Sequence, residues 1–260
     1  MSTRARDAAD IIGARNPLGP IETAVVLGRE FLAAADIGEQ AVAIPYSELP
    51  GFPEIEGGEV VIGLVEGAPM LFLKGRSEFY ESGDPSLMSS PIETLTLLNV
   101  RALLSTGFAT STNADFQPSS ILSVTDHINF SGLNPLIGAA GQNFVNMNGA
   151  YDKRLLRRLK QAGAGAGVTL HEGIFMWFSG PSYETPAEAK MARTLGADAL
   201  GVAIAPEAIL AKRFALPFAA MAVISDYATG FAGGNPTYDP SRASGVIALR
   251  RLLRAYQKVK

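Results

Sequence analysis

Four short groups of polar residues follow apolar runs, and their side chains are of the kinds that bind anions or transfer protons. They occupy positions 28–30 (Gly-Arg-Glu), 76–81 (RSEFYE), 183–184 (Tyr-Glu) and 225–227 (Ser-Asp-Tyr). An arginine can hold an anionic group, and a carboxyl group can accept or donate a proton. Each group also has an ordinary structural explanation, such as Arg76 pairing with Glu78 or Glu81 on the surface.

The apolar runs predict short buried strands that alternate with helices. The alternation predicts an α/β fold with a twisted, mixed but mostly parallel sheet flanked by helices. Because no linker or repeat interrupts residues 1–260, one domain is expected. The expected strands are 23–27, 41–44, 60–65 and 70–74 as a hairpin, 102–105, 121–124, 173–178, 199–202 and 218–224. The expected helices are 92–98, 148–162 before a turn at 163–167, 187–195, 206–214 and 241–259.

In a mostly parallel sheet the carboxyl ends of the strands gather at one edge, so the four polar groups are expected to share a pocket there. The stretch GPSYETPAE at 180–188 has the strongest local signals. Gly-Pro marks a turn, Thr185 suits a helix N-cap before Pro186, and Glu188 completes a capping box. This geometry places Glu184 at the carboxyl end of a strand, although a carboxylate there could also simply satisfy a helix dipole.

Composition narrows the function classes. The chain has 260 residues, 47% hydrophobic and 18% charged, with a net charge of -3, which favours a globular protein and opposes nucleic-acid binding. It has no Cys and two His, so no metal site is expected. The chain has no apolar run long enough to span a membrane and no apolar signal segment at its start, so we expect a soluble cytoplasmic protein.

Several segments, taken in their order and spacing, resemble one family over most of the chain. They are IPYSELP at 44–50, Gly-Arg at 75–76, Tyr-Glu at 80–81, DHIN at 126–129, NPL at 134–136, GPSYETPAE at 180–188, LGADA at 195–199 and Pro-Glu at 206–207. With these segments the chain resembles the trimeric purine nucleoside phosphorylases and the related methylthioadenosine phosphorylases. The resemblance implies a phosphorylase/hydrolase-like fold, a homotrimer, a purine nucleoside substrate, and phosphate as co-substrate with no other cofactor.

In that family phosphate attacks the sugar while the purine–ribose bond breaks, and the purine leaves more readily when its N7 is protonated. The resemblance places Asp226 opposite N7, where a protonated carboxyl group could act as general acid. It assigns base binding to Tyr183, Glu184, Val202 and Ala109, and ribose binding to Tyr80 and Tyr238. Asp226 resembles the adenosine-type members and Glu184 the guanosine and inosine type, so the base stays open.

The anion side of the site departs from the family pattern. The resemblance assigns phosphate binding to Gly28, Arg29 and Arg76. Glu78 stands where the family has His, Ala203 where it has a hydroxyl, and GFATS at 107–111 where it has a Gly-rich loop. An unpaired carboxylate about 4 Å from a phosphate oxygen would oppose binding by about 4 kcal/mol at an effective dielectric of 20. Arg29 could offset this by pairing with Glu78 or by binding phosphate itself.

Three functions are therefore open. The family framework favours phosphorolysis of a purine nucleoside. The alternative is hydrolysis, in which Glu78 is the general base that activates a water molecule. The third is a homologue that binds nucleosides without catalysis.

Overall fold

The computed structural model describes residues 1–139, 144–237 and 244–259. Its nine strands belong to one sheet, in the order β2-β3-β4-β1-β5-β8-β7-β6-β9. The strands are β1 (Thr23–Leu27), β2 (Glu39–Pro45), β3 (Glu59–Val65), β4 (Ala68–Lys74), β5 (Ala102–Ser111), β6 (Ile121–Asn129), β7 (Leu170–Trp177), β8 (Ala199–Gly201) and β9 (Phe218–Tyr227). The helices are α1 (Thr3–Arg15), α2 (Phe79–Ser82), α3 (Ser89–Leu97), α4 (Lys153–Ala166), α5 (Pro186–Thr194), α6 (Ala205–Arg213) and α7 (Ser244–Lys258), with 3-10 turns η1 (Arg29–Ile37) and η2 (Tyr46–Glu48).

The sheet is mixed, as predicted, but it also closes on itself. Within the described residues, five of the nine strand pairings are parallel and four are antiparallel, including the predicted β3–β4 hairpin. Strand β5 pairs with β1, β8 and β9, so that β5, β8, β7, β6 and β9 form a closed ring. The alternation of strands and helices did not predict this closure, because it depends on which distant strands pair.

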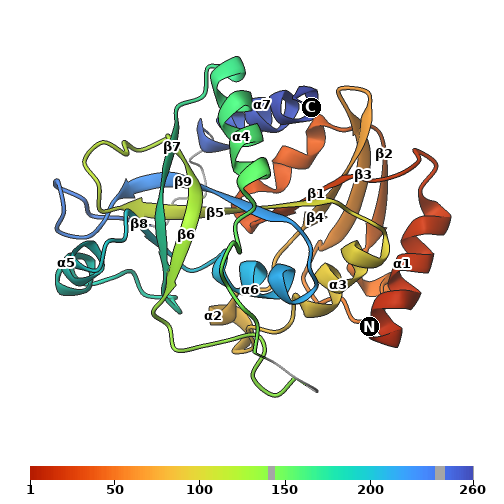
Figure 1. The fold of residues 1–260 in the computed structure, drawn as a ribbon, viewed down its shortest axis with the longest axis horizontal. Helices are drawn as coiled ribbons and strands as arrows, with labels where there is room; N and C mark the ends of the chain where they lie inside the picture. The colour runs from red at the N-terminus through yellow and green to blue at the C-terminus, as the bar shows by residue number, and fades with distance from the viewer. Residues whose placement is uncertain (140–143, 238–243, 260) are drawn as a thin grey trace.

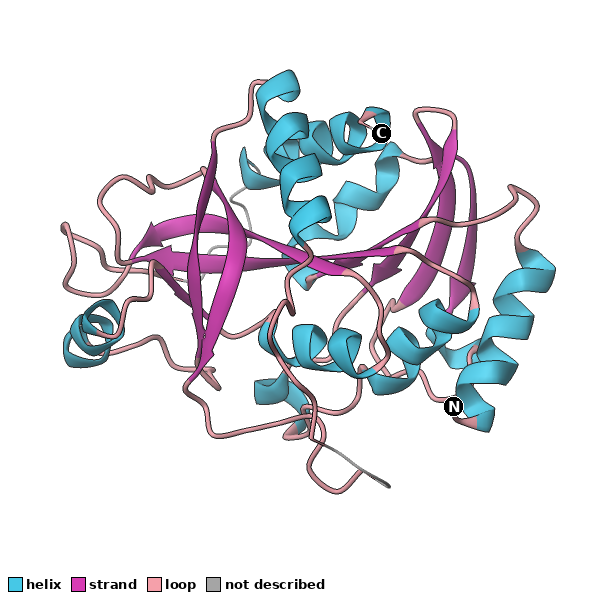
Figure 2. Cartoon of the chain, in the orientation of Figure 1, coloured by secondary structure: helices cyan, strands magenta, loops and turns pink. Residues whose placement is uncertain are grey.

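Two groups of helices cover the sheet (Figure 1, Figure 2). Helices α4 and α7 and the 3-10 turn η1 pack together on one side, and α1, α3 and α6 pack on the other. The two main hydrophobic clusters contain the fully buried Trp177 and Phe175, and Phe31, Phe72 and Tyr256, respectively. Burial of each such side chain contributes roughly 1.5–3 kcal/mol relative to exposure, which gives the sheet rigid support on both faces.

The predicted turn at 180–188 is confirmed in detail. Thr185 is the N-cap of α5, and its Oγ1 accepts a hydrogen bond from the backbone N–H of Glu188 at 3.3 Å. Glu188 Oε2 in turn accepts from the backbone N–H of Thr185 at 2.8 Å, and Pro186 occupies the first turn. The two reciprocal bonds satisfy donors that the helix leaves unpaired. They fix the backbone immediately after Glu184.

Several predicted boundaries were wrong: β6, expected at 121–124, runs to Asn129, and two other differences lie next to glycines. Residues 163–166 belong to α4, which begins at Lys153 and ends against Gly167 with a positive φ of 62°. Gly163 lies inside the helix, where a Cβ would be only 3.3 Å from the side chain of Leu170. The missing side chain therefore lets Leu170 pack closely against the helix. Residues 107–111, expected to be a loop by resemblance, are the second half of β5. They stay extended because they pair with β9 along that whole stretch.

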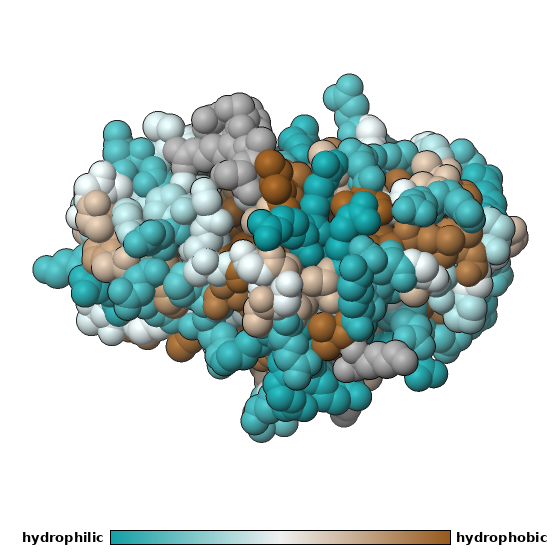
Figure 3. Space-filling model, turned by 90° about the horizontal axis from the view of Figure 1, so that it is seen from above, coloured by the Kyte–Doolittle hydropathy of each residue, from teal (hydrophilic) through white to brown (hydrophobic). Residues whose placement is uncertain are grey.

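The basic faces of α4 and α7 are surface features. Lys160 pairs with Glu172, and Lys258 pairs with Glu66. The face of the molecule seen from above is largely hydrophilic, with scattered hydrophobic patches (Figure 3). The charges of these basic residues are partly neutralised by the ion pairs. In the parts of the chain that the structure describes, the helices are all too short or too polar to cross a bilayer.

Candidate active site

A cavity of about 450 Å³ lies where the carboxyl ends of several strands meet. Its volume is within the range of small-molecule sites. All four polar groups singled out in the sequence contribute to its wall: Arg29 and Glu30, Tyr80 and Glu81, Tyr183 and Glu184, and Ser225. The sheet therefore brings together side chains that are up to nearly 200 positions apart, as the strand-end argument predicted.

Two residues of the cavity wall each carry a buried polar atom that has no partner among the described residues. Glu184 is 6% exposed, and its Oε2 makes no hydrogen bond. Thr110 is 2% exposed, and its Oγ1 is likewise without a partner. Burial raises the pKa of Glu184, although a bond from its own backbone N–H opposes that rise. A buried polar atom without a partner costs free energy unless a ligand satisfies it, so this part of the cavity wall is suited to a polar ligand.

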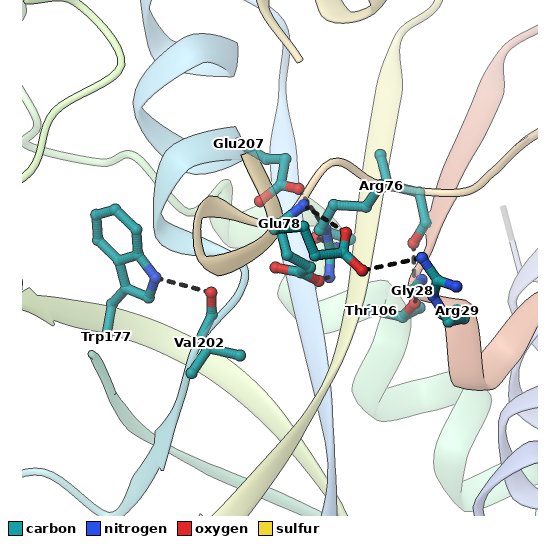
Figure 4. A network of polar contacts seen from close by, with 11 residues as sticks. Gly28, Arg29, Arg76, Glu78, Thr106, Trp177, Val202 and Glu207 are labelled. Carbon is teal, nitrogen blue, oxygen red and sulfur yellow. Dashed lines mark hydrogen bonds and ion pairs between the residues drawn. The ribbon is translucent and has the colours of Figure 1, made fainter. Parts of the chain in front are cut away.

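The walls beside these polar atoms are apolar and closely packed. Val202 and Ala109 line the cavity, together with the half-exposed rings of Tyr183 and Tyr80. The carbonyl of Val202 accepts a hydrogen bond of 2.8 Å from Nε1 of buried Trp177 (Figure 4). This bond fixes the strand end, and flat apolar walls suit an aromatic ring.

Gly180 allows the turn to close over this wall. Its φ is 65°, and a Cβ added there would lie 2.9 Å from Val202 Cγ1 and 3.4 Å from the ring of Tyr80. Side chains other than hydrogen would be strained in this conformation and would clash with the cavity wall. The glycine therefore positions Tyr80 and Val202 against the segment that carries Glu184.

Two predicted site residues, Arg76 and Glu78, do not line the cavity; they belong to a buried network that lies near the lining residues Glu30 and Glu81 (Figure 4). The Arg76 side chain is 2% exposed; its Nε donates to Glu207 Oε1 at 2.5 Å and its Nη2 to Ser105 Oγ at 2.7 Å. The third nitrogen, Nη1, donates to Glu78 Oε1 at 3.4 Å. Although burial disfavours the charge, Glu207 and Glu78 hold the pKa of Arg76 above its usual value. Two of the three nitrogens are thus held tightly inside the protein.

Glu78 is the loosest of these partners and has an unusual protonation state. Burial raises its pKa to about 8, Arg76 opposes the rise, and Glu207 and Glu30 add to it. Glu78 is therefore mostly protonated near pH 7. Glu78 is not unpaired, because Arg76 Nη1 donates to its Oε1.

Arg29 and Gly28 also differ from expectation. Arg29 does not pair with Glu78; its Nη2 donates to Glu81 Oε1 at 2.9 Å, with the Arg29 side chain 62% exposed. Gly28 does not line the cavity, and its N–H points to Thr106 Oγ1 at 3.4 Å. A Cβ at Gly28 would lie 3.1 Å from Glu30 Oε2 and 3.6 Å from Arg76 Nη1. The absence of a side chain at Gly28 lets Glu30 and Arg76 approach the backbone closely.

Asp226 does not line the cavity, and Tyr238 cannot be placed relative to it. Asp226 follows the lining residue Ser225 on β9, and its Oδ1 accepts from the backbone N–H of Tyr227 at 2.8 Å. Tyr238 lies outside the described residues, but its neighbour Thr237 lines the cavity. The role of Asp226 as general acid stays a prediction.

Seven lining residues were not among the predicted site residues: Phe108, Thr110, Pro181, Ser182, Leu200, Gly201 and Thr237. Thr110 and Phe108 lie on β5 and line the cavity, and the Phe108 ring packs against Phe31 with 4.7 Å between centroids. Ser182 lies in the turn before α5. The continuous β-forming run from 102 to 111 could have indicated the longer strand, but only its pairing with β9 shows which residues reach the site.

The fold and the cavity define a class: an α/β protein with a small-molecule site at the carboxyl edge of a mixed sheet. Residues 22–259 match the model of the phosphorylase superfamily, and the chain belongs to that superfamily. It is 36% identical over 245 residues to purine nucleoside phosphorylase 1 of Geobacillus stearothermophilus, covering 91% of this chain and 89% of the relative. It is 31% identical to the purine nucleoside phosphorylase of Mycobacterium tuberculosis, over 95% of this chain and 92% of the relative.

The fold agrees with these relationships. A Schistosoma purine nucleoside phosphorylase solved in complex with hypoxanthine superposes with a TM-score of 0.87, covering 98% of this chain and 96% of that chain at 24% identity. The resemblance read from the motifs, and the fold that it implied, are thus confirmed. The parts of the chain that the structure describes contain no cluster of three or more His, Asp or Glu side chains suited to a metal ion.

The Arg76–Glu207 pair gives a stability prediction. We expect Glu207→Gln to lower the free energy of unfolding by about 3 kcal/mol, because it leaves a buried guanidinium short of its closest anion. Glu59→Gln is the matched control, since Glu59 pairs with Lys74 while 28% exposed and should cost less than about 1 kcal/mol. Urea unfolding measures both; equal losses would contradict the assignment of Arg76–Glu207 as a structural pair.

Proposed function

We propose that the protein is a purine nucleoside phosphorylase: phosphate attacks the sugar carbon, the N-glycosidic bond breaks, and free purine and sugar 1-phosphate form. The observation that carries the proposal is the cavity of about 450 Å³ with two unpartnered buried polar atoms, Glu184 Oε2 and Thr110 Oγ1, between apolar walls. The identity of 31–36% to purine nucleoside phosphorylases over nearly the whole chain supports the choice of reaction.

In this proposal the base occupies the end of the cavity near Glu184. Its ring lies between Tyr183 and the wall of Val202 and Ala109, and its polar edge satisfies Glu184 and Thr110. Tyr80, packed beside Gly180, contacts the sugar. The sugar becomes cation-like as the bond breaks, so the leaving purine needs a proton or hydrogen-bond donor, the role proposed for Asp226.

Phosphate is placed at the other end, near Arg76, Gly28 and Arg29. Burial raises the pKa of Glu78, which favours its neutral form. A neutral Glu78 repels an anion less strongly than a carboxylate would, so its position beside Arg76 is compatible with a phosphate site.

The reaction predicts a requirement for phosphate. Candidate purine nucleosides incubated with the purified protein should release free base only when phosphate is present, with sugar 1-phosphate formed in equal amount. Base release is followed by chromatography, with parallel samples in phosphate-free buffer. Release that continues unchanged without phosphate would favour a hydrolase. Nucleoside binding without any release would favour the non-catalytic homologue.

The base end can be tested with two substitutions, of which the first is nearly isosteric. Thr110→Val removes the unpartnered hydroxyl, and we expect kcat/KM for the preferred nucleoside to fall about 5- to 100-fold, the value of one lost hydrogen bond. Asp226→Ala should lower turnover by more than about tenfold if Asp226 is the general acid. Thr194→Val, at the exposed far end of α5, is the control. Unchanged kinetics for either variant would remove that residue from the site.

We further propose that the protein is a homotrimer and acts in the cytoplasm. The segment after β6 supports self-association, because Phe130, Ile137 and Phe144 are 48%, 74% and 107% exposed there. Large apolar side chains gathered at a surface favour a protein interface. Light scattering should give three times the chain mass of 27.4 kDa, and Phe144→Ser should shift it towards the monomer. A monomeric mass for the unaltered protein would contradict the trimer.

A further inference from the structure

The three donor nitrogens of Arg76 are not equally committed. Nε and Nη2 are held at 2.5 Å and 2.7 Å by Glu207 and Ser105, which are 1% and 0% exposed. Nη1 makes the longest contact, 3.4 Å to Glu78, whose side chain is 14% exposed (Figure 4). Nη1 also lies close to Gly28, where an added Cβ would be 3.6 Å from it and 3.1 Å from Glu30 Oε2. Of the three donors of Arg76, Nη1 is therefore the one that an anion could reach, and its present acceptor is Glu78.

The surroundings of Glu78 are crowded with carboxylates. Glu207 on α6 and Glu30 on η1 both act on it, and Glu81 on α2 accepts from its backbone N–H at 3.5 Å. The facing cations are Arg76 itself and Arg29, whose charge is shared with Glu81. Glu30 and Glu81 line the cavity, so this carboxylate cluster borders the ligand space. An ionised Glu78 would add to the negative charge of this region and repel an oxyanion electrostatically.

We propose that Glu78 binds the oxyanion as a neutral carboxylic acid, donating its proton in a hydrogen bond to an anion oxygen while Arg76 Nη1 supplies the positive charge. Glu78 is thereby the specificity-determining residue of the anion subsite, and it couples anion binding to uptake of one proton. The identification of the physiological anion as phosphate rests on the proposed function. The subsite itself rests on the geometry around Arg76.

The sign of the pH dependence follows. Below about pH 8 Glu78 carries its proton and can donate to the anion, so the subsite is open. As pH rises through that value Glu78 ionises, loses its donor, and repels the anion. Above about pH 8, each anion bound must bring one proton to Glu78, so affinity falls roughly tenfold per pH unit.

The test measures anion binding directly by calorimetry on either side of pH 8, with sulfate and inorganic phosphate as probes. Sulfate does not change its charge in this range, so the protein alone sets its pH dependence. In the unaltered protein we expect sulfate affinity to fall steeply above the Glu78 titration. Repeating the titration in buffers of different ionisation enthalpy should show uptake approaching about one proton per anion there.

Two variants isolate Glu78. Glu78→Gln keeps an N–H donor and cannot ionise, so it should bind sulfate with nearly constant affinity across the range and without proton uptake. Glu78→Ala should bind more weakly at low pH and also without the steep slope. Glu172→Gln, a surface carboxylate paired with Lys160, is the control and should keep the slope of the unaltered protein.

The outcomes separate this inference from the proposed reaction. The inference is overturned if Glu78→Gln shows the same slope as the unaltered protein, or if the unaltered protein takes up no proton when it binds sulfate above pH 8. Either result leaves phosphate-dependent base release standing. Conversely, a pH-dependent sulfate site that Glu78→Gln makes pH-independent supports the inference even if no nucleoside is cleaved. The proton measurement on the unaltered protein decides the question if the variants fold poorly.

Discussion

The buried guanidinium of Arg76 is the constraint on which the anion end of the site depends. It lies just after β4, and its contacts reach Glu207 on α6 and Ser105 on β5, so one side chain ties three elements together. A buried charge must be paired, and Glu207 supplies the closest anion to Arg76. The looser contact with Glu78 leaves one donor exchangeable. Structural support and ligand binding are thus divided among the nitrogens of one residue.

The two halves of the proposed site differ in the interactions that would bind a ligand. Around Glu184, the wall is held in place by the Trp177–Val202 hydrogen bond and by the capped turn before α5. Two buried polar atoms there have no hydrogen-bond partner within the described residues. That half suits a flat, polar-edged base. Around Arg76 the side chains are ionisable, and the charge of Glu78 depends on whether its carboxyl group is protonated.

Local signals predicted much of the fold. The capped turn was readable because Gly180, Thr185, Pro186 and Glu188 act on one another within nine residues. Strand periodicity and the β3–β4 hairpin were equally local. The errors came where tertiary pairing extended an element: β5 runs on to Ser111 because β9 lies beside it, and α4 runs through Gly163 because Leu170 packs there. The closed ring of strands was not readable at all, since no local pattern states which distant strands pair.

By itself, the sequence determined the α/β class, the superfamily, and which polar groups would meet at the strand ends, because strand direction fixes where those groups lie. Tertiary structure alone decided their chemistry. It paired Arg29 with Glu81 instead of Glu78, buried Thr110 without a partner, and surrounded Glu78 with Glu207 and Glu30. The physical reason is that a carboxyl group's charge depends on its burial and on neighbours within a few ångströms. Those neighbours come from segments that are far apart in the chain.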